Sequence, residues 1–200
     1  MPDDKAARMK HIEERLNQLE GSPLYDYRRE NGYHAVIGDG SLDAKVMFVG
    51  EAPGENEAKQ GRPFVGAAGR ILGELLEGIG LKREDVYITN VVKDRPPGNR
   101  DPRPEEIALY TPLLVEQIEL IRPVVIGALG RFSMDFLLDL FDAPERGGKI
   151  SDLHGKALTG TASYGPVTIV PLYHPAAAFY RRELREEMTR DFETIHRAIG

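Results

Sequence analysis

The sequence predicts an α/β domain built around a mostly parallel sheet of four strands. Four short apolar runs recur along the chain, each about as long as a buried strand and each bordered by glycine, proline or polar residues. Segments with apolar residues three and four positions apart, the spacing of one helix face, separate these runs. This alternation is typical of parallel sheets with helical crossovers. The chain has 200 residues and suits a single domain covering 1–200.

The elements follow in order along the chain. An amphipathic N-terminal helix is predicted at about 4–20. Residues 21–44 are rich in turn formers and predict an irregular connection. The predicted strands are 45–50, 85–92, 123–130 and 166–175. The remaining predicted helices are 68–80, 104–121, 131–140 and 184–199. Pro112 should kink or restart the second of these helices, and 152–160 is a candidate for an extra edge strand.

Composition restricts the possible chemistry. The chain contains no cysteine, which excludes disulfides, thiolate nucleophiles and cysteine-bound zinc or iron–sulfur centres. Its five histidines lack metal-binding spacing such as HExxH, so no metal site is predicted. No apolar run approaches the roughly 18 residues of a membrane span, and no signal sequence is evident, so we expect a cytoplasmic protein. A net charge of −6 argues against polyanion binding by the whole surface, but not against a local basic face.

Polar residues and glycines concentrate directly after the predicted strands. In open α/β sheets, ligands bind at the carboxyl ends of the strands, so these loops should form one site. Glu51 follows the first strand, Asn90 ends the second, and His174 follows the fourth. A carboxylate, an amide and an imidazole suit a planar, neutral, hydrogen-bonding ring.

The loops around this site carry two further features. Phe64, in GRPFVG, is either a core aromatic or a platform on which a base could stack. The loop NVVKDRPPGNRDP holds Arg95 and Arg100 among prolines, so it should be stiff and suited to a phosphate backbone. Glu55 is best explained as an acidic residue at a helix N-terminus.

Four motifs together resemble one family. VMFVGEAPGENEAKQGRPFVGAAGRIL, VYITNVVK followed by RPPGNRDP and PEEI, RPVVIGALGR, and PLYHPAA resemble the family 4 uracil-DNA glycosylases of bacteria and archaea. The motifs occur in that family's order and at nearly its spacing, from about residue 20 to the C-terminus. The resemblance implies a three-layer αβα fold around the parallel sheet.

The resemblance also implies roles for the loop after the first strand. Glu51 and Ala52 would lie at a uracil pocket, with Glu51 positioning or activating the attacking water. Glu57 would lie near C5 of the base and exclude the methyl group of thymine. Phe64 would stack on the flipped uracil.

By the same resemblance, Asn90 would read the uracil edge and His174 would donate a hydrogen bond to O2. Asn90 can pair with O4 and N3–H of uracil, whereas cytosine reverses that donor and acceptor pattern and leaves buried groups unpaired. A donor from His174 would stabilise charge that develops on uracil as the glycosidic bond breaks.

The base lies inside the duplex, so the reaction requires base flipping and contacts with the flanking DNA. The basic proline loop and the helix start after GALGR would hold phosphates, and AAAFYRRELR would wedge the minor groove. Plain helix packing is the alternative for Phe179. The predicted DNA contacts are Arg95, Arg100, Gly130, Arg131, Phe179, Tyr180 and Arg181.

The chain departs from the family at its cofactor. Members bind a [4Fe–4S] cluster through four cysteines, and those places fall here on Leu19, Ser22, Asp94 and Tyr110. We therefore expect no cofactor and a cluster site refilled by side chains, with Leu19 and Tyr110 as the bulky ones. Asp94, if buried, needs a cationic partner.

Three functions are consistent with these features. The first is a monomeric, monofunctional uracil-DNA glycosylase without lyase activity, acting on single- or double-stranded DNA. The second is a glycosylase for hypoxanthine or xanthine, with Ala52 and Glu57 tuning the specificity. The third is an inactive DNA-binding relative, which the presence of Glu51, Phe64 and the other motif side chains argues against.

Overall fold

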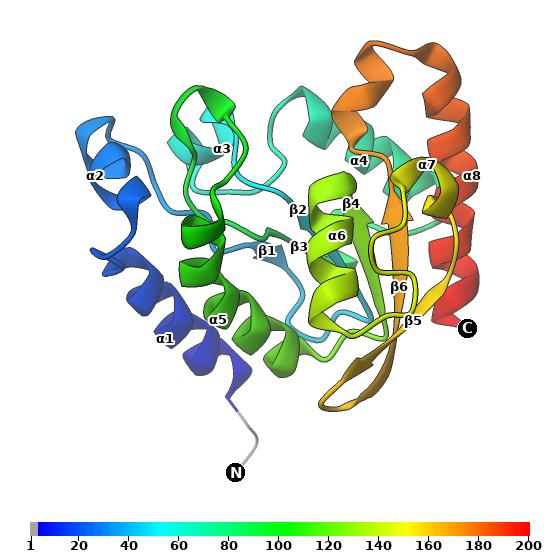
Figure 1. The fold of residues 1–200 in the computed structure, drawn as a ribbon, viewed down its shortest axis with the longest axis horizontal. Coiled ribbons are helices and arrows are strands. Elements are labelled where there is room, and N and C mark those ends of the chain that lie inside the picture. The colour runs from blue at the N-terminus through cyan, green and yellow to red at the C-terminus, as the bar shows by residue number, and fades with distance from the viewer. Residues whose placement is uncertain (1–3) are drawn as a thin grey trace.

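The computed structural model describes residues 4–200, apart from the side chain of Arg182. Over that range six strands form one sheet in the order β1-β3-β2-β4-β6-β5 (Figure 1). The strands are β1 Asp39–Gly40, β2 Val46–Gly50, β3 Tyr87–Asn90, β4 Val125–Leu129, β5 Leu158–Ala162 and β6 Gly165–Leu172.

The four central strands are parallel, whereas β1 and β5 pair antiparallel at the two edges. This confirms the predicted α/β fold and its four principal strands. The predicted strand count is too low because two edge strands extend the sheet. The candidate edge strand exists as β5 but begins only at Leu158, and β1 is two residues without an apolar pattern.

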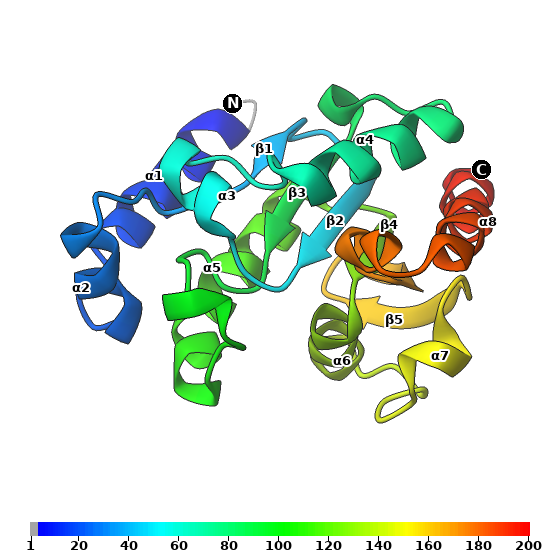
Figure 2. The same ribbon diagram turned by 90° about the horizontal axis from the view of Figure 1, so that it is seen from above.

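Helices cover both faces of the sheet. Figures 1 and 2 show α1, α5 and α6 on one face and α4 and α8 on the other. The α-helices are α1 Lys5–Asn17, α2 Pro23–Glu30, α3 Glu55–Gln60, α4 Ala67–Gly78, α5 Pro104–Ile121, α6 Arg131–Leu140, α7 Ile150–Leu153 and α8 Arg182–Ile199. Within residues 4–200, the loops also contain three 3₁₀ turns: η1 Arg83–Asp85, η2 Pro97–Asn99 and η3 Pro175–Phe179.

Alternation along β2 explains why both layers are needed. Met47 and Val49 pack into the half of the core that holds α1, α5 and α6. Phe48 points to the opposite half, where its ring stacks on Phe192 of α8 with centroids 5.6 Å apart. Since every residue of β2 is buried, each face of the sheet requires its own helices.

The irregular connection expected at 21–44 was wrong, and of the two alternatives for Pro112 the restart of the helix was wrong. The segment 21–44 contains α2, which begins where Ser22 accepts a hydrogen bond from the N–H of Leu24 (3.2 Å) and Pro23 occupies the first turn. Helix α5 runs through Pro112 as one element, so proline does not restart it. Burial of one α5 face against α1 and the sheet outweighs the missing N–H at Pro112.

A buried polar network occupies the places where the resembling family has its cluster cysteines. The Tyr110 hydroxyl donates to Asp94 Oδ2 (2.7 Å), and Ser22 Oγ lies 2.7 Å from that hydroxyl. Arg28 Nη1 lies 3.1 Å from Asp94 Oδ1, with both side chains almost fully buried. Leu19 is partly buried and packs against the core.

These residues do not fit an iron–sulfur cluster, because none offers a thiolate and their polar groups satisfy one another. Burial raises the pKa of Asp94, while hydrogen bonding by Tyr110 and the charge of Arg28 oppose that rise. A buried ion pair adds little net stability but is costly to break. The main effect of the network is therefore to fix α2 against the loop that follows β3.

Tyr110→Phe should lower the free energy of unfolding by about 1–3 kcal/mol, because Asp94 and Ser22 lose a partner while staying buried. Urea denaturation followed by circular dichroism measures this loss. Tyr25→Phe is the control, since its hydroxyl meets Glu20 only at the surface, at 3.5 Å. Equal, near-zero losses in the two variants would contradict a stabilising network.

Candidate active site

Backbone pairing brings two of the predicted site residues side by side. Gly50 of β2 pairs in register with Asn90 of β3. The pairing continues past both strands, because Val91 N–H donates to Gly50 O (2.9 Å) and Val92 N–H donates to Glu51 O (3.0 Å). Glu51 therefore leaves the sheet next to Asn90, at the carboxyl ends of the strands.

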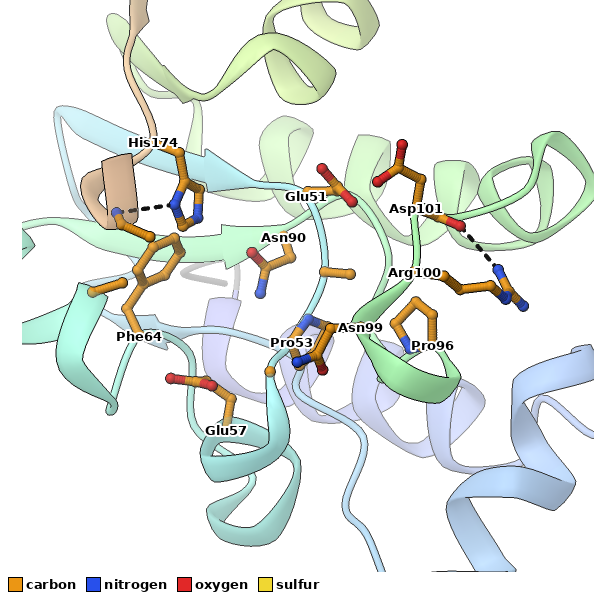
Figure 3. A pocket seen from close by; sticks show the side chains of 14 residues that line it. Glu51, Pro53, Glu57, Phe64, Asn90, Pro96, Asn99, Arg100, Asp101 and His174 are labelled. Atoms are coloured by element: carbon orange, nitrogen blue, oxygen red, sulfur yellow. Dashed lines mark hydrogen bonds between the residues drawn. The ribbon is translucent and has the colours of Figure 1, made fainter. Parts of the chain in front are cut away.

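A cavity of about 530 Å³ opens at this edge of the sheet (Figure 3). Three of its walls come from the segments after β2, β3 and β6, and the fourth comes from the start of α4. All six side chains that the sequence predicted for the base pocket line it: Glu51, Ala52, Glu57, Phe64, Asn90 and His174.

Asn90 is held firmly at the floor of the cavity, where it is 2% exposed. Its backbone carbonyl accepts a hydrogen bond from Lys93 Nζ (2.8 Å), which also bonds Thr89 Oγ1 and Gln117 Oε1, both at 2.6 Å. Lys93 is fully buried, and that burial lowers its pKa. A Cβ at Gly50 would lie 2.4 Å from Asn90 Oδ1, so only glycine leaves room for this amide.

His174 is oriented by its own backbone turn. Its Nδ1 accepts a hydrogen bond from Ala176 N–H (3.2 Å), so the ring proton is assigned to Nε2. Burial lowers the pKa of His174, partly offset by the charge of Glu57, which favours a neutral ring. The imidazole faces the Phe64 ring with centroids 5.8 Å apart. A neutral imidazole with a free Nε2–H is a hydrogen-bond donor to the cavity.

Glu57 is tied to the loop that carries Phe64. Its Oε1 accepts hydrogen bonds from the N–H groups of Val65 (3.0 Å) and Gly66 (2.9 Å). The Phe64 ring is 7% exposed and lines the cavity while packing on the α4 and α8 half of the core. The ring is therefore part of the core and also lines the cavity, and its use as a stacking platform stays a prediction.

The carboxylate of Glu51 faces a second acid that sequence reasoning missed. Figure 3 shows Asp101 on the same side of the cavity as Glu51. Burial raises the pKa of Glu51, the negative charge of Asp101 raises it further, and Arg131 opposes both. Asn99 also lines the cavity. Asn99 and Asp101 flank Arg100 in the sequence GNRD, and this position in the loop was the only sign in the sequence that they could reach the site.

Arg95 differs from the expected open, phosphate-facing side chain. Only 9% of its side chain is exposed. Its guanidinium donates to Tyr33 Oη (2.7 Å) and to Asn99 Oδ1 (2.8 Å), and lies 3.5 Å from Glu55 Oε2. These contacts make Arg95 a brace between α3 and the proline loop.

Arg100 is likewise engaged within the protein. Its guanidinium forms two hydrogen bonds with the carboxylate of Glu106, at 2.9 and 2.5 Å, and the Glu106 side chain is fully buried. Glu106 also accepts a hydrogen bond from Arg103 N–H (2.9 Å) at the start of α5. The Arg100 side chain is still 31% exposed and lines the cavity, so its contact with DNA remains a prediction.

The other predicted DNA contacts lie on accessible segments. Phe179 is 53% and Tyr180 88% exposed, which argues against plain helix packing for Phe179. Arg181 is exposed at the start of α8. The side chain of Arg131 is 67% exposed, and Gly130, with φ of 98°, turns the chain from β4 into α6.

Comparison with known proteins defines the class. Residues 37–195 match the family model of the uracil DNA glycosylase superfamily. The chain is 50% identical over 165 residues to the type-4 uracil-DNA glycosylase of Archaeoglobus fulgidus, covering 82% of both chains. It is 43% identical over 190 residues to that of Thermotoga maritima, covering 92% of this chain and 91% of the relative. A type-5 uracil-DNA glycosylase of Pyrobaculum aerophilum is 32% identical over 68% of this chain.

The chain belongs to the type-4 uracil-DNA glycosylase family within that superfamily. This confirms the family that the motifs predicted. Because the whole chain contains no cysteine, it is a member that cannot bind the family's iron–sulfur cluster. Among residues 4–200, no helix is long and apolar enough to cross a membrane.

Proposed function

We propose that this protein is a monofunctional uracil-DNA glycosylase of DNA repair, which flips uracil out of DNA and hydrolyses its N-glycosidic bond. The convergence of Glu51, Phe64, Asn90 and His174 on one cavity carries the proposal. The similarity to type-4 uracil-DNA glycosylases over most of the chain supports it. No amine lies among the residues that line the cavity, which favours simple hydrolysis without lyase activity.

The leaving group is stabilised by His174. Cleavage gives the sugar oxocarbenium character and leaves negative charge on uracil. The Nε2–H of a neutral His174 donates to O2, where that charge gathers, and its burial strengthens the interaction. The backbone hydrogen bond to Nδ1 fixes this tautomer before substrate binds.

Base selection falls to Asn90 and Phe64. The Asn90 amide pairs with O4 and N3–H of uracil, and cytosine presents the reversed donor and acceptor pattern. The hydrogen bond from Lys93 Nζ to the Asn90 carbonyl fixes the backbone from which this amide projects. Phe64 stacks on the base. Glu57 stands near C5 and disfavours the thymine methyl.

The water is positioned by Glu51. A carboxylate accepts a proton best when its pKa lies near the working pH, so burial and the adjacent Asp101 make Glu51 a better base.

On the DNA side, Phe179 and Tyr180 form the wedge, while Arg131 and Arg181 contact phosphates. Arg95 and Arg100 support this surface mainly by holding the proline loop. We also infer that the protein works as a single-domain monomer, since one sheet carries every part of the site. We expect it to work in the cytoplasm.

The direct test uses labelled oligonucleotides carrying uracil, hypoxanthine, xanthine or thymine, incubated with the purified protein in EDTA. We expect excision of uracil, seen as strand cleavage only after alkali. Cleavage without alkali would contradict a monofunctional enzyme. Excision of hypoxanthine or xanthine instead of uracil would overturn the specificity, and binding without excision would overturn catalysis.

Asn90→Ala and His174→Ala should each slow single-turnover uracil excision by about 100- to 1,000-fold, the usual effect of losing one such transition-state contact. Binding to abasic-site DNA should persist in both. Asn31→Ala and His11→Ala replace the same residue types on the surface, away from the cavity, and should excise at the wild-type rate. A wild-type rate in either site variant would remove that residue from the mechanism.

The pH dependence of excision should report Glu51. Its pKa is raised above 4.5, and only the ionised form accepts a proton, so the rate should fall as pH drops through this raised value. Asp101→Asn removes a negative charge that favours the protonated form of Glu51. The fall of the excision rate on the acid side of the pH profile should therefore move to lower pH. Asp43→Asn, on a distant surface, controls for net charge. If the rate of Asp101→Asn falls at the same pH as that of the wild type, a group other than Glu51 controls this pH dependence.

A further inference from the structure

Phe64 has a backbone conformation that L-residues avoid. Its φ is 49°, in the left-handed region where a bulky side chain is a genuine outlier. Such a conformation is strained and persists only when the surrounding structure imposes it. This conformation sets the direction in which the Phe64 ring leaves the chain, and the ring lines the uracil cavity.

Charged side chains hold this segment from two sides. Arg83, in η1 just before β3, donates from Nη1 to Phe64 O (2.9 Å) and from Nη2 to Pro63 O. Glu57, in α3, accepts from the next two backbone N–H groups, those of Val65 and Gly66. Two successive carbonyls are thus bound by a cation and two successive amides by an anion.

Two further features show that the position is built tightly. A Cβ at Gly69 would lie 1.8 Å from Phe64 O, so α4 can approach this carbonyl only through glycine. The side chain of Arg83 is partly buried, with 28% of it exposed, and its Nε lies 3.7 Å from Asp39 Oδ2. An arginine held in this way is occupied by backbone groups and is not free to contact DNA.

We propose that Arg83 is a positioning residue for base stacking, which with Glu57 clamps Phe64 in its left-handed conformation and so holds the ring across the flipped uracil. The proposal rests on the proposed function. Without the two hydrogen bonds from Arg83, residue 64 relaxes toward negative φ. The Phe64 ring then no longer lies parallel to the flipped base. Glu57 then has a structural duty in addition to its place near C5.

A double-mutant cycle tests whether Arg83 acts through Phe64. Arg83→Gln should slow single-turnover excision on the order of 10- to 100-fold, as expected for a misplaced substrate contact. In the Phe64→Ala background the same change should have almost no further effect, because the ring it positions is absent. Losses that simply multiply would overturn the proposal, as would a wild-type rate in Arg83→Gln.

Arg62→Gln is the matched control. Arg62 also pairs with Asp39, at 2.8 Å, but its side chain is 58% exposed and makes none of the hydrogen bonds to residues 63 and 64. This variant removes the same charge from the same partner and should keep the wild-type rate. Gly69→Ala is a charge-neutral second variant that presses on the Phe64 carbonyl and should reproduce the loss.

A second readout needs no activity. The chain contains no tryptophan, so Phe64→Trp introduces a single tryptophan at the ring position, which can be excited at wavelengths that its eight tyrosines do not absorb. Adding Arg83→Gln should increase acrylamide quenching of this tryptophan in the DNA-free protein, whereas adding Arg62→Gln should not. Unchanged quenching with Arg83→Gln would overturn the clamp. If quenching rises as expected but the protein does not excise uracil, the clamp stands and only the proposed function is refuted.

Discussion

The structure depends on the parallel pairing of β2 with β3, and above all on its continuation beyond the strand ends. Because the ladder extends to Val91 and Val92, Glu51 and Asn90 emerge together at one point of the sheet edge. The absence of a side chain at Gly50 leaves space for the Asn90 amide. The buried amine of Lys93 donates a hydrogen bond to the backbone carbonyl of Asn90 and so fixes this end of β3. The placement of Glu51 and Asn90 in the cavity thus follows from sheet geometry.

The loop after β3 has few backbone hydrogen bonds of its own, those of η2 among them, because each of its prolines lacks an N–H donor. Side chains supply the missing restraints. Asp94 ties the loop to α2 and α5, Arg95 ties it to α3, and Arg100 ties it to the buried carboxylate of Glu106. Much of the positive charge that the loop carries in sequence is therefore used inside the protein.

The sequence predicted the features encoded by periodicity and motif placement, namely the central strands, the main helices and the side chains gathered in the cavity. It missed β1 because two residues carry no pattern, and α2 because its capping signal lies among turn formers. It could not foresee the inward use of Arg95, whose partners Tyr33 and Glu55 are distant in the chain. Asp101 reaches the cavity only through the course of the loop after η2.

The network of Ser22, Arg28, Asp94 and Tyr110 has a consequence for the conditions under which repair can proceed. Iron–sulfur clusters are held by thiolates, and thiolates are the groups most readily oxidised. Here hydrogen bonds and an ion pair hold the same region, and the whole chain has no thiol to lose. Peroxide therefore finds no thiolate to oxidise in this network, and iron starvation removes nothing from it. The protein also needs no cluster-assembly machinery in order to fold.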